Sequence, residues 1–297
     1  MKFLEIGLNL KKIIHNPIIM TILIAVLIFI IFFAFDIRLS IKKYTIESSP
    51  INSAIKIALI TDLHSCYYGK NQVTLVRALE EQNPDIVLLG GDIFDDKIDD
   101  KNTEIFLKAI HNKYPCYYVT GNHEYWSGEA NFNAKMGILK KYGIKILSNE
   151  FKTITVNGEK INICGADDPY SYIITENMNN SYFDELNNFE ENISALSKAS
   201  ENENFTLLLS HQPELFDIYT KYGFDLVLCG HAHGGQWRIP FILNGVYAPN
   251  QGIFPQYAGG RYEKDGTVMI VSRGLARETT YVPRIFNRPE LVIIDLK

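Results

Sequence analysis

The stretch IKIALITDLH (Ile55–His64) begins with six residues that are apolar except for Lys56 and leads through Thr61 into Asp62 and His64. A short run of this kind, rich in β-branched side chains, is typical of a buried strand. The same pattern recurs in IVLLGGD (Ile86–Asp92) and in CYYVTGNH (Cys116–His123). The sequence therefore predicts several buried strands, each of which ends in polar side chains.

Helical patterns separate these strands. Val73, Val76 and Leu79 follow a helical period that stops before Pro84. An Asn157-Gly158 pair between two strand-like runs predicts a β-hairpin. Repeated βα units followed by strand-rich ends predict a layered α/β fold with a mixed sheet. The later strands are expected at 206–210, 226–230, 267–272 and 291–296.

The polar residues after the strands are the main functional signal. In α/β proteins, ligands bind beyond the carboxyl ends of the strands. A single Asp or His at such a point usually serves as a turn or hydrogen-bonding residue, but five of the seven histidines occur there, so we favour metal binding. In His231-Ala232-His233 we expect an extended backbone that turns both rings the same way. The candidate ligands are Asp62, His64, Asp92, Asn122, His211, His231 and His233.

This ligand set indicates both the number and the type of metal. Histidine nitrogen combined with carboxylate and amide oxygen suits Mn, Fe, Zn or Ni. Seven ligands are too many for one tetrahedral ion, but they are enough for two ions that share one carboxylate. The four cysteines show no CxxC spacing, so we expect buried, unreactive thiols and no structural zinc cage.

The blocks DLH, GDIFD, GNHE, SH and GHAH resemble, in order, the signature motifs of the calcineurin-like metallophosphoesterases. The later stretches HAHGGQ, VSRGL and IFNRPE resemble the membrane-associated branch of YkuE/YaeI-type phosphodiesterases and UDP-2,3-diacylglucosamine pyrophosphatase-like proteins. The resemblance runs from about residue 55 to the end. It implies a four-layer sandwich of two mixed β-sheets flanked by helices, and a binuclear hydrolase.

The resemblance also implies roles for individual residues. One metal would be held by Asp62, His64, Asp92 and His233, and the other by Asp92, Asn122, His211 and His231. A hydroxide bridging the metals would attack phosphorus, and His123 would stabilise the transition state or protonate the leaving oxygen. Asp95 resembles a residue that orients a histidine or a loop.

Other polar residues carry weaker predictions. Arg273 follows a strand, and either phosphate binding or a structural ion pair would explain its position. The same two explanations apply, slightly less strongly, to Arg238. We expect Asp96, Asp99 and Asp100 to form a solvated charge run. His15 and His111 are expected to be solvated.

The amino-terminal region predicts a membrane anchor. Residues 17–35 contain no charged side chain, and nineteen residues at 1.5 Å each span about 28 Å, close to the hydrocarbon thickness of a bilayer. The run ends in phenylalanines rather than small residues, which favours a retained anchor over a cleaved signal. We expect a segment 1–16, an anchor 17–35, a tether 36–54 and a catalytic domain 55–297, in a single-pass membrane protein. The flanking charges slightly favour an amino terminus inside and an extracytoplasmic domain.

Charge and composition limit the partners. Residues 1–50 carry six basic and three acidic groups, a net charge of +3. Since the whole chain has a net charge of −5, the remainder carries about −8. An acidic body disfavours nucleic-acid binding; we infer no obligate protein partner. The apolar segment Ile239–Tyr257 could be a wall for a lipid tail, a bilayer contact or an ordinary hairpin, and Asp168–Asn204 a lid or a surface insertion.

Three interpretations of the function remain. The first is hydrolysis of a membrane-derived phosphate, a lipid-linked pyrophosphate or phosphodiester being examples. The second is a broad phosphodiesterase for soluble or cell-wall phosphates, with the anchor serving only for location. The third is a non-catalytic protein that keeps a metal-stabilised fold. Degenerate proteins of this kind usually lose ligands, whereas none of the expected ligands is missing here.

Overall fold

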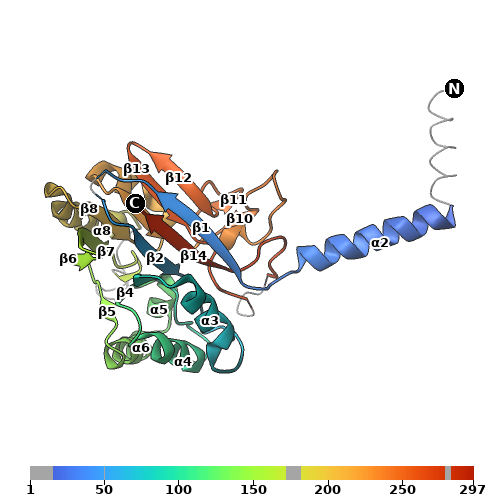
Figure 1. The fold of residues 1–297 in the computed structure, drawn as a ribbon, viewed down its shortest axis with the longest axis horizontal. Helices are drawn as coiled ribbons and strands as arrows, with labels where there is room; N and C mark the ends of the chain where they lie inside the picture. The colour runs from blue at the N-terminus through green and yellow to red at the C-terminus, as the bar shows by residue number, and fades with distance from the viewer. Residues whose placement is uncertain (1–15, 50, 172–181, 278–281) are drawn as a thin grey trace.

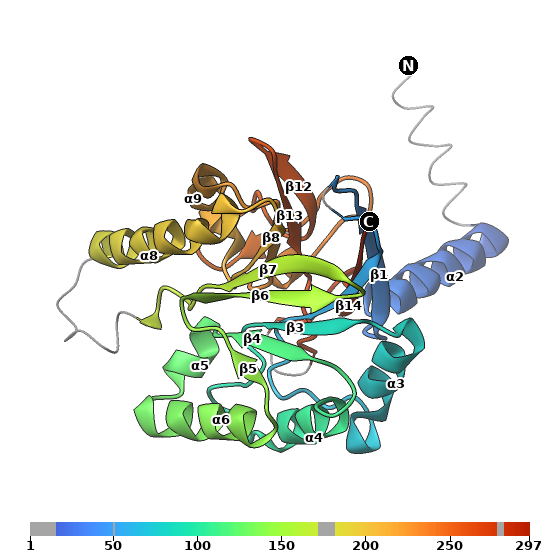
Figure 2. The ribbon, with the colours of Figure 1, turned by 60° about the vertical axis from the view of Figure 1, so that its left-hand side comes forward.

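The computed structural model describes residues 16–49, 51–171, 182–277 and 282–297. Two six-stranded sheets form the body, and helices lie on their outer faces (Figures 1 and 2). Most of the predicted segment 1–16 and part of the predicted insertion 168–204 lie outside the described residues.

The first sheet has the strand order β1-β14-β2-β3-β4-β5. The parallel strands β2, β3, β4 and β5 alternate with helices, as the sequence predicts, and β14 runs antiparallel to β2. The bounds are β1 Ser40–Ile46, β2 Ile55–Ile60, α3 Val73–Gln82, β3 Ile86–Gly90, α4 Lys101–Ile110, β4 Cys116–Val119, α5 Asn122–Trp126, α6 Glu129–Lys141, β5 Lys145–Ile146 and β14 Glu290–Leu296.

The second sheet has the order β12-β13-β9-β8-β7-β6. Strands β7, β8, β9 and β13 are parallel to one another, and antiparallel strands lie at both edges. The hairpin predicted at Asn157-Gly158 joins β6 to β7. The bounds are β6 Glu150–Val156, β7 Glu159–Gly165, α8 Tyr182–Leu196, β8 Phe205–Leu209, α9 Phe216–Tyr219, β9 Leu226–Cys229, β12 Gly260–Lys264 and β13 Thr267–Val271, with a small separate hairpin of β10 Tyr247–Ala248 and β11 Gly252–Ile253.

Three hydrophobic cores join four layers. Alternate residues of each strand point to opposite faces, so Ile57 and Leu59 of β2 pack between the sheets while Ala58 and Ile60 pack against helices α3, α4 and α6. A third core lies between the second sheet and helices α8 and α9. All four cysteines are buried and free. The fold is the predicted helix–sheet–sheet–helix sandwich, and both buried strand sets direct their carboxyl ends to one end of the molecule.

Residues 40–46, which the sequence analysis assigned to a tether, instead form the edge strand β1. This strand pairs in parallel with β14 over its whole length. Lys42 and Lys43 are exposed, which is the common protection of a sheet edge against pairing with another chain. Polar edge strands lack the continuous apolar run of buried strands, and this explains why the pattern indicated a tether.

Helix α2 (Pro17–Ala34) projects from the body (Figure 1). Within the described part of the chain it is the one helix long and apolar enough to cross a membrane, judged by length and composition. Ala34 is its single buried residue, so the helix is not part of the core. Its carboxyl end is fixed to the body, because the Phe286 N–H donates to the Ala34 carbonyl at 2.7 Å.

Candidate metal centre

All seven predicted ligands lie at the carboxyl ends of strands that face one cleft. Asp62, Asp92 and Asn122 follow β2, β3 and β4 of the first sheet, while His211 and the His231–His233 segment follow β8 and β9 of the second. All seven side chains are buried. A cleft of about 550 Å³ opens beside them, and four of the seven, Asp92, Asn122, His231 and His233, line it. The two sheets thus supply ligands to the same place, although the residues are up to 171 positions apart in the sequence.

The ligands form two clusters that share Asp92. Side-chain atoms of Asp62, His64, Asp92 and His233 all lie within 4.8 Å of one another, and so do those of Asp92, His211 and His231. The shared oxygen, Asp92 Oδ2, is 3.6 Å from His64 Nε2 and 3.0 Å from His211 Nε2. This is the arrangement that two ions bridged by one carboxylate require.

Hydrogen bonds on the far side of two rings turn their free nitrogens toward Asp92. His211 Nδ1 lies 2.8 Å from the Gly90 carbonyl oxygen, which can only accept, so Nδ1 carries the proton. His64 Nδ1 lies 3.0 Å from Asp95 Oδ2 in the same manner. Orientation of a ligating histidine by a carbonyl or a carboxylate is a regular feature of metal sites.

Buried polar atoms without partners test whether a metal fits these residues. Native proteins satisfy nearly all buried polar groups, so several unsatisfied atoms at one point need an explanation. Cations would satisfy all of the atoms in this cluster, because each is a carboxylate oxygen, an amide oxygen or an imidazole nitrogen. The unpartnered atoms are Asp62 Oδ2, His64 Nε2, Asp92 Oδ2, Asn122 Oδ1, His211 Nε2 and His233 Nδ1.

The electrostatics of the cleft favour neutral rings at His231 and His233 beside an ionised Asp92. Burial, and then the neighbouring His211, lower the pKa of His231 to about 3. Burial and His64 lower the pKa of His233 well below its ordinary value. Burial opposes the ionisation of Asp92, but His211 outweighs it and holds the pKa of Asp92 well below the usual range. Neutral imidazole and ionised carboxylate are the forms that bind metals. At His211 burial opposes the charged form, but Asp92 outweighs burial and raises the pKa well above its ordinary value. At His64 burial is likewise outweighed by the hydrogen bond with Asp95, which raises the pKa.

The sequence predicts an extended backbone for the His231–His233 segment. This prediction is wrong, because the backbone forms a turn there. Both histidines have a positive φ, 63° and 46°, and His231 donates its backbone N–H to Asp62 Oδ1 at 2.9 Å. This tight turn sends the two rings to different clusters instead of the same side. Asp62, His64 and Asp92 also have positive φ. Non-glycine residues adopt this conformation rarely and at a cost, and such residues concentrate at functional sites.

His123 lies at the mouth of the cleft and does not join the two ligand clusters. Its ring makes an edge contact with the His64 ring, with centroids 4.4 Å apart, and its side chain is 23% exposed. Nδ1 lies 2.7 Å from Asp96 Oδ1 and 4.0 Å from Asp95 Oδ2. Asp96, expected in a solvated charge run, is therefore largely buried against His123 and holds the ring. No sequence pattern indicates this contact.

Glu124 is a second residue that the sequence analysis gave no role. Its buried carboxylate accepts hydrogen bonds from four backbone N–H groups at 2.8–3.0 Å, those of Asp92, Ile93, Phe94 and Gly121. It therefore fixes the loop that carries Asp92 against the loop that carries Asn122. Its position three residues after Gly121 is that of the glutamate in a capping box, and it binds the N–H of the N-cap residue, although Gly121 has no side chain to complete the box.

Arg238 and Arg273 do not line the cleft. Arg273 forms an ion pair with Glu290, with Nε 2.5 Å from Oε2, which matches the structural alternative for this residue. Arg238 donates a hydrogen bond to Asn244. Both arginines line two other cavities.

The segment Ile239–Tyr257 contains the β10–β11 hairpin, with strongly exposed apolar residues at Phe241, Ile242, Ile253 and Phe254. Of the predicted insertion 168–204, residues 172–181 lie outside the described residues and α8 packs on the second sheet. His111 lies at the end of α4, in ring contact with Tyr142.

Comparison with known proteins identifies the family. The profile of the calcineurin-like phosphoesterases matches residues 55–235. An uncharacterized metallophosphoesterase of Helicobacter pylori (strain J99 / ATCC 700824) is 31% identical over 242 residues, which are 80% of this chain and 58% of that protein. The chain thus spans 58% of the length of that relative. The phosphodiesterase YaeI of Escherichia coli is 26% identical over 245 residues, 81% of this chain and 82% of that one.

The fold is also found among solved structures. The NAD nucleotidase NadN of Haemophilus influenzae superimposes with a TM-score of 0.51 at 15% identity, over 76% of this chain and 46% of that one. A likeness at this identity concerns the fold alone. Taken with the profile match and the sequence relatives, it confirms the resemblance drawn from the motifs: the chain belongs to the calcineurin-like phosphoesterase family.

Proposed function

We propose that the cleft holds two divalent cations and hydrolyses phosphate esters. Asp62, His64, Asp92 and His233 would hold one ion, and Asp92, Asn122, His211 and His231 the other. The observation that carries the proposal is the pair of ligand clusters sharing Asp92, with buried and unpartnered ligand atoms in both. The ligand types suit Mn, Fe, Zn or Ni.

When bound, two cations would polarise the phosphoryl group and lower the pKa of the attacking water. The residues of the chain orient the metal ligands and supply the proton for the leaving group. Asp95 and the Gly90 carbonyl hold the rings of His64 and His211, so that one nitrogen of each faces Asp92. Glu124 fixes the Asp92 loop through four backbone hydrogen bonds.

His123 would protonate the leaving group. With Nδ1 held by Asp96, the other ring nitrogen, Nε2, can donate a proton to the oxygen that leaves phosphorus. Trp126 also contacts the ring, with centroids 4.6 Å apart, and limits its movement. An ester with a poor leaving group would depend on this proton most strongly.

A membrane-derived lipid phosphate is the substrate class we propose, in the form of a phosphodiester or a pyrophosphate. Helix α2 would bring the cleft to a membrane. The walls of the cleft include exposed apolar side chains, Ile98, Trp126 and Val282, which suit an acylated substrate. The name of the E. coli relative, a phosphodiesterase, supports a diester.

Chelation and reconstitution test the metal requirement. The full chain in detergent is stripped with a chelator, and Mn, Fe, Zn or Ni is returned while hydrolysis of a soluble chromogenic diester and metal content are measured. We expect activity to disappear and to return as two ions per chain bind. Undiminished activity in metal-free protein would refute the two-cation proposal.

A second assay tests the substrate class. An acylated phosphodiester in vesicles is compared with a water-soluble analogue that has the same headgroup. We expect a higher kcat/KM for the acylated diester. Equal values would favour the alternative of a broad phosphodiesterase with an anchor that only locates it, and would leave the metal chemistry intact.

A further inference from the structure

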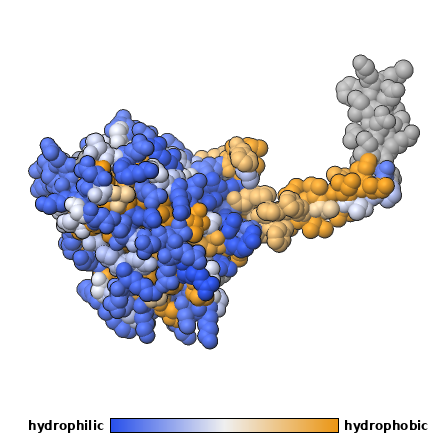
Figure 3. Space-filling view, in the orientation of Figure 1, coloured by the Kyte–Doolittle hydropathy of each residue, from blue (hydrophilic) through white to orange (hydrophobic). Residues whose placement is uncertain are grey.

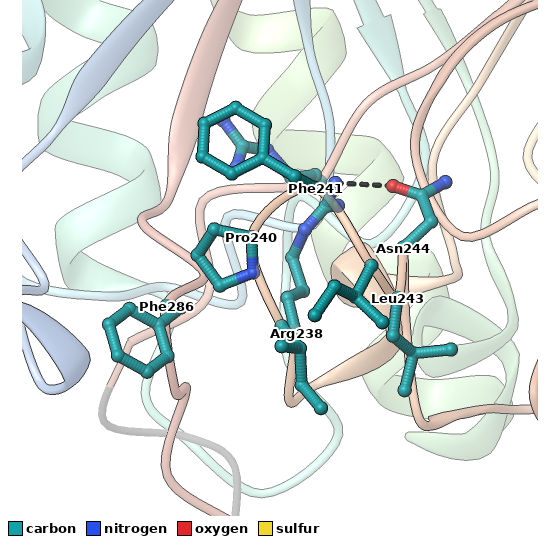
Figure 4. Close-up of a pocket in the computed structure, with 9 residues that line it drawn as sticks. Arg238, Pro240, Phe241, Leu243, Asn244 and Phe286 are labelled. Atoms are coloured by element: carbon teal, nitrogen blue, oxygen red, sulfur yellow. Dashed lines mark hydrogen bonds between the residues drawn. The ribbon is translucent and has the colours of Figure 1, made fainter.

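A cationic pocket lies outside the metal-centre cleft. Arg238, Asn244 and Arg273 line both a cavity of about 480 Å³ and an adjoining one of about 330 Å³, whose linings include none of the predicted metal ligands. We call the two cavities together the arginine pocket. Figure 4 shows Arg238 reaching to Asn244, with Pro240 and Phe241 beside it.

The arginine pocket carries an excess of positive charge. Four cations line the smaller cavity, and among its described residues only Glu290 contributes a carboxylate. Glu290 is paired with Arg273, and Arg261 is paired with Glu263. Arg238 Nη1 is buried and has no hydrogen-bond partner. A buried guanidinium donor without a partner needs an acceptor, and guanidinium groups match phosphate geometry. The four cations are Lys42, Arg238, Arg261 and Arg273.

One wall of the arginine pocket is apolar and open to solvent. The turn Ile239–Leu243, which we call the apolar loop, closes on itself through the Ile239 N–H and the Leu243 carbonyl. At its tip, Phe241 is fully exposed and Ile242 is 82% exposed. An anion site beside exposed apolar side chains is suited to a ligand that is itself amphiphilic.

The arginine pocket lies at the root of helix α2. Trp237 is bridged to Ile285, and the Arg238 N–H donates to the Ile285 carbonyl at 3.0 Å. The next residue, Phe286, lines the pocket and donates its N–H to Ala34 at the end of α2. Arg288 donates to the carbonyls of Arg38 and Leu39 just beyond the helix. Figure 3 shows hydrophobic surface on the body beside the root of the helix.

The fixed root determines which side of the body meets the membrane. If α2 crosses a bilayer, the short path from Ala34 through Phe286 to the apolar loop places that loop at the same bilayer surface. Exposed aromatic and aliphatic side chains stabilise such interfacial positions, and basic residues at a membrane surface attract anionic lipids.

We propose that the arginine pocket binds the phosphate of an anionic membrane lipid, whose acyl chains lie along the apolar loop while the loop enters the bilayer surface. The lipid is a positioning ligand and not the substrate, because the pocket shares no lining residue with the predicted ligands. This site would hold the body in one orientation on the membrane. The proposal does not depend on hydrolytic activity.

Lipid-specific quenching of Trp237 tests the proposal. Trp237 is 43% exposed and adjoins Arg238, and the chain has only one other tryptophan, Trp126. The full chain is placed in nanodiscs of phosphatidylcholine with a minority of phosphatidylglycerol. Bromine atoms, which quench nearby tryptophans, are carried on the acyl chains of either the neutral or the anionic lipid.

We expect the anionic lipid to quench more strongly than its mole fraction predicts, with an enrichment of about fivefold, the factor that about 1 kcal/mol per surface cation provides. Trp237→Phe should abolish the difference between the two carriers, which assigns the signal. Arg238→Ala should make quenching by the neutral lipid and by the anionic lipid equal in proportion to their mole fractions. Phe241→Ser combined with Ile242→Ser should reduce quenching by both lipids. Lys221→Ala, which removes an exposed cation beside α9, is the matched control and should change nothing.

Three results would overturn the proposal. Equal quenching by both carriers in the unaltered protein would mean contact with lipid without recognition of phosphate. An absence of quenching that depends on Trp237 would mean that the loop does not meet the bilayer. Loss of the difference on adding inorganic phosphate would assign the pocket to a free anion. If Arg238→Ala lacks a cooperative thermal transition, Lys42→Ala, at an exposed position of β1, serves in its place and should lower the enrichment.

Discussion

The metal-centre cleft, of about 550 Å³, and the larger cavity of the arginine pocket, of about 480 Å³, are similar in size, but their unsatisfied atoms differ in kind. In the cleft these atoms are carboxylate and amide oxygens and imidazole nitrogens, which donate electron pairs to cations. In the pocket the unsatisfied atom is a guanidinium nitrogen, which can only donate. The chemical type of the buried, unpartnered atom would therefore distinguish the proposed cation site from the proposed anion site.

The two sites also differ in how they are held. The cleft is built on the ends of buried strands, and its ligands are fixed by hydrogen bonds to carbonyls, to Asp95 and to Glu124. The apolar loop of the pocket packs little of its surface, since Phe241 and Ile242 are exposed. Changes in the cleft should therefore have large effects on chemistry, whereas changes at the loop tip should affect only membrane contact.

Asp92→Ala should give the largest effect, because it removes the one carboxylate that both ligand clusters share. We expect both ions to be lost and kcat/KM for a soluble diester to fall by at least about 10⁴-fold, since metal ions contribute several kcal/mol each to phosphoryl transfer. Metal analysis and steady-state kinetics measure the two effects. Asp217→Ala, at an exposed acid paired with Lys264, is the control. Retention of both ions in Asp92→Ala would contradict the shared-ligand arrangement.

His123→Ala should have the next largest effect and should not change metal content. Loss of a general acid costs about 10²-fold or more in rate. The loss should be greatest for an alkyl ester and smallest for a nitrophenyl ester, whose leaving group needs no proton. An equal loss for both esters would show that His123 acts by another means than proton donation.

Asp95→Asn and Asp96→Asn should separate two roles that adjacent carboxylates play. Asp95 contacts His64, so its substitution should weaken metal binding by about 10–100-fold. Asp96 contacts His123, so its substitution should lower kcat with metal affinity unchanged. Each variant is the control for the other, and titration calorimetry with kinetics measures both. If the two variants behaved alike, the distinct contacts seen here would have no functional meaning.

Much of the fold and of the metal centre could be predicted from the sequence. The features that could not be predicted depend on contacts that exist only in the folded chain. The buried strands β2, β3, β8 and β9 are continuous apolar runs, so their ends and the polar residues beyond them could be predicted. The turn at His231 could not, because its positive φ depends on a hydrogen bond to Asp62, 169 residues away. Asp96 looked solvated because only the folded loop brings it to His123. The edge strand β1 is too polar to show a buried-strand pattern.

Substitution of Phe241 and Ile242 by Ser should have the smallest effect on stability. Both side chains are largely exposed, so their loss removes little buried surface, and surface substitutions usually change the free energy of unfolding by less than about 0.5 kcal/mol. Phe106→Ala, at a fully buried position of the core beneath the first sheet, should instead cost about 3–5 kcal/mol. Denaturant unfolding of the full chain in detergent measures both. A loss of more than about 2 kcal/mol from the loop substitutions would exceed what exposed side chains contribute. It would mean that the loop packs against protein rather than against lipid.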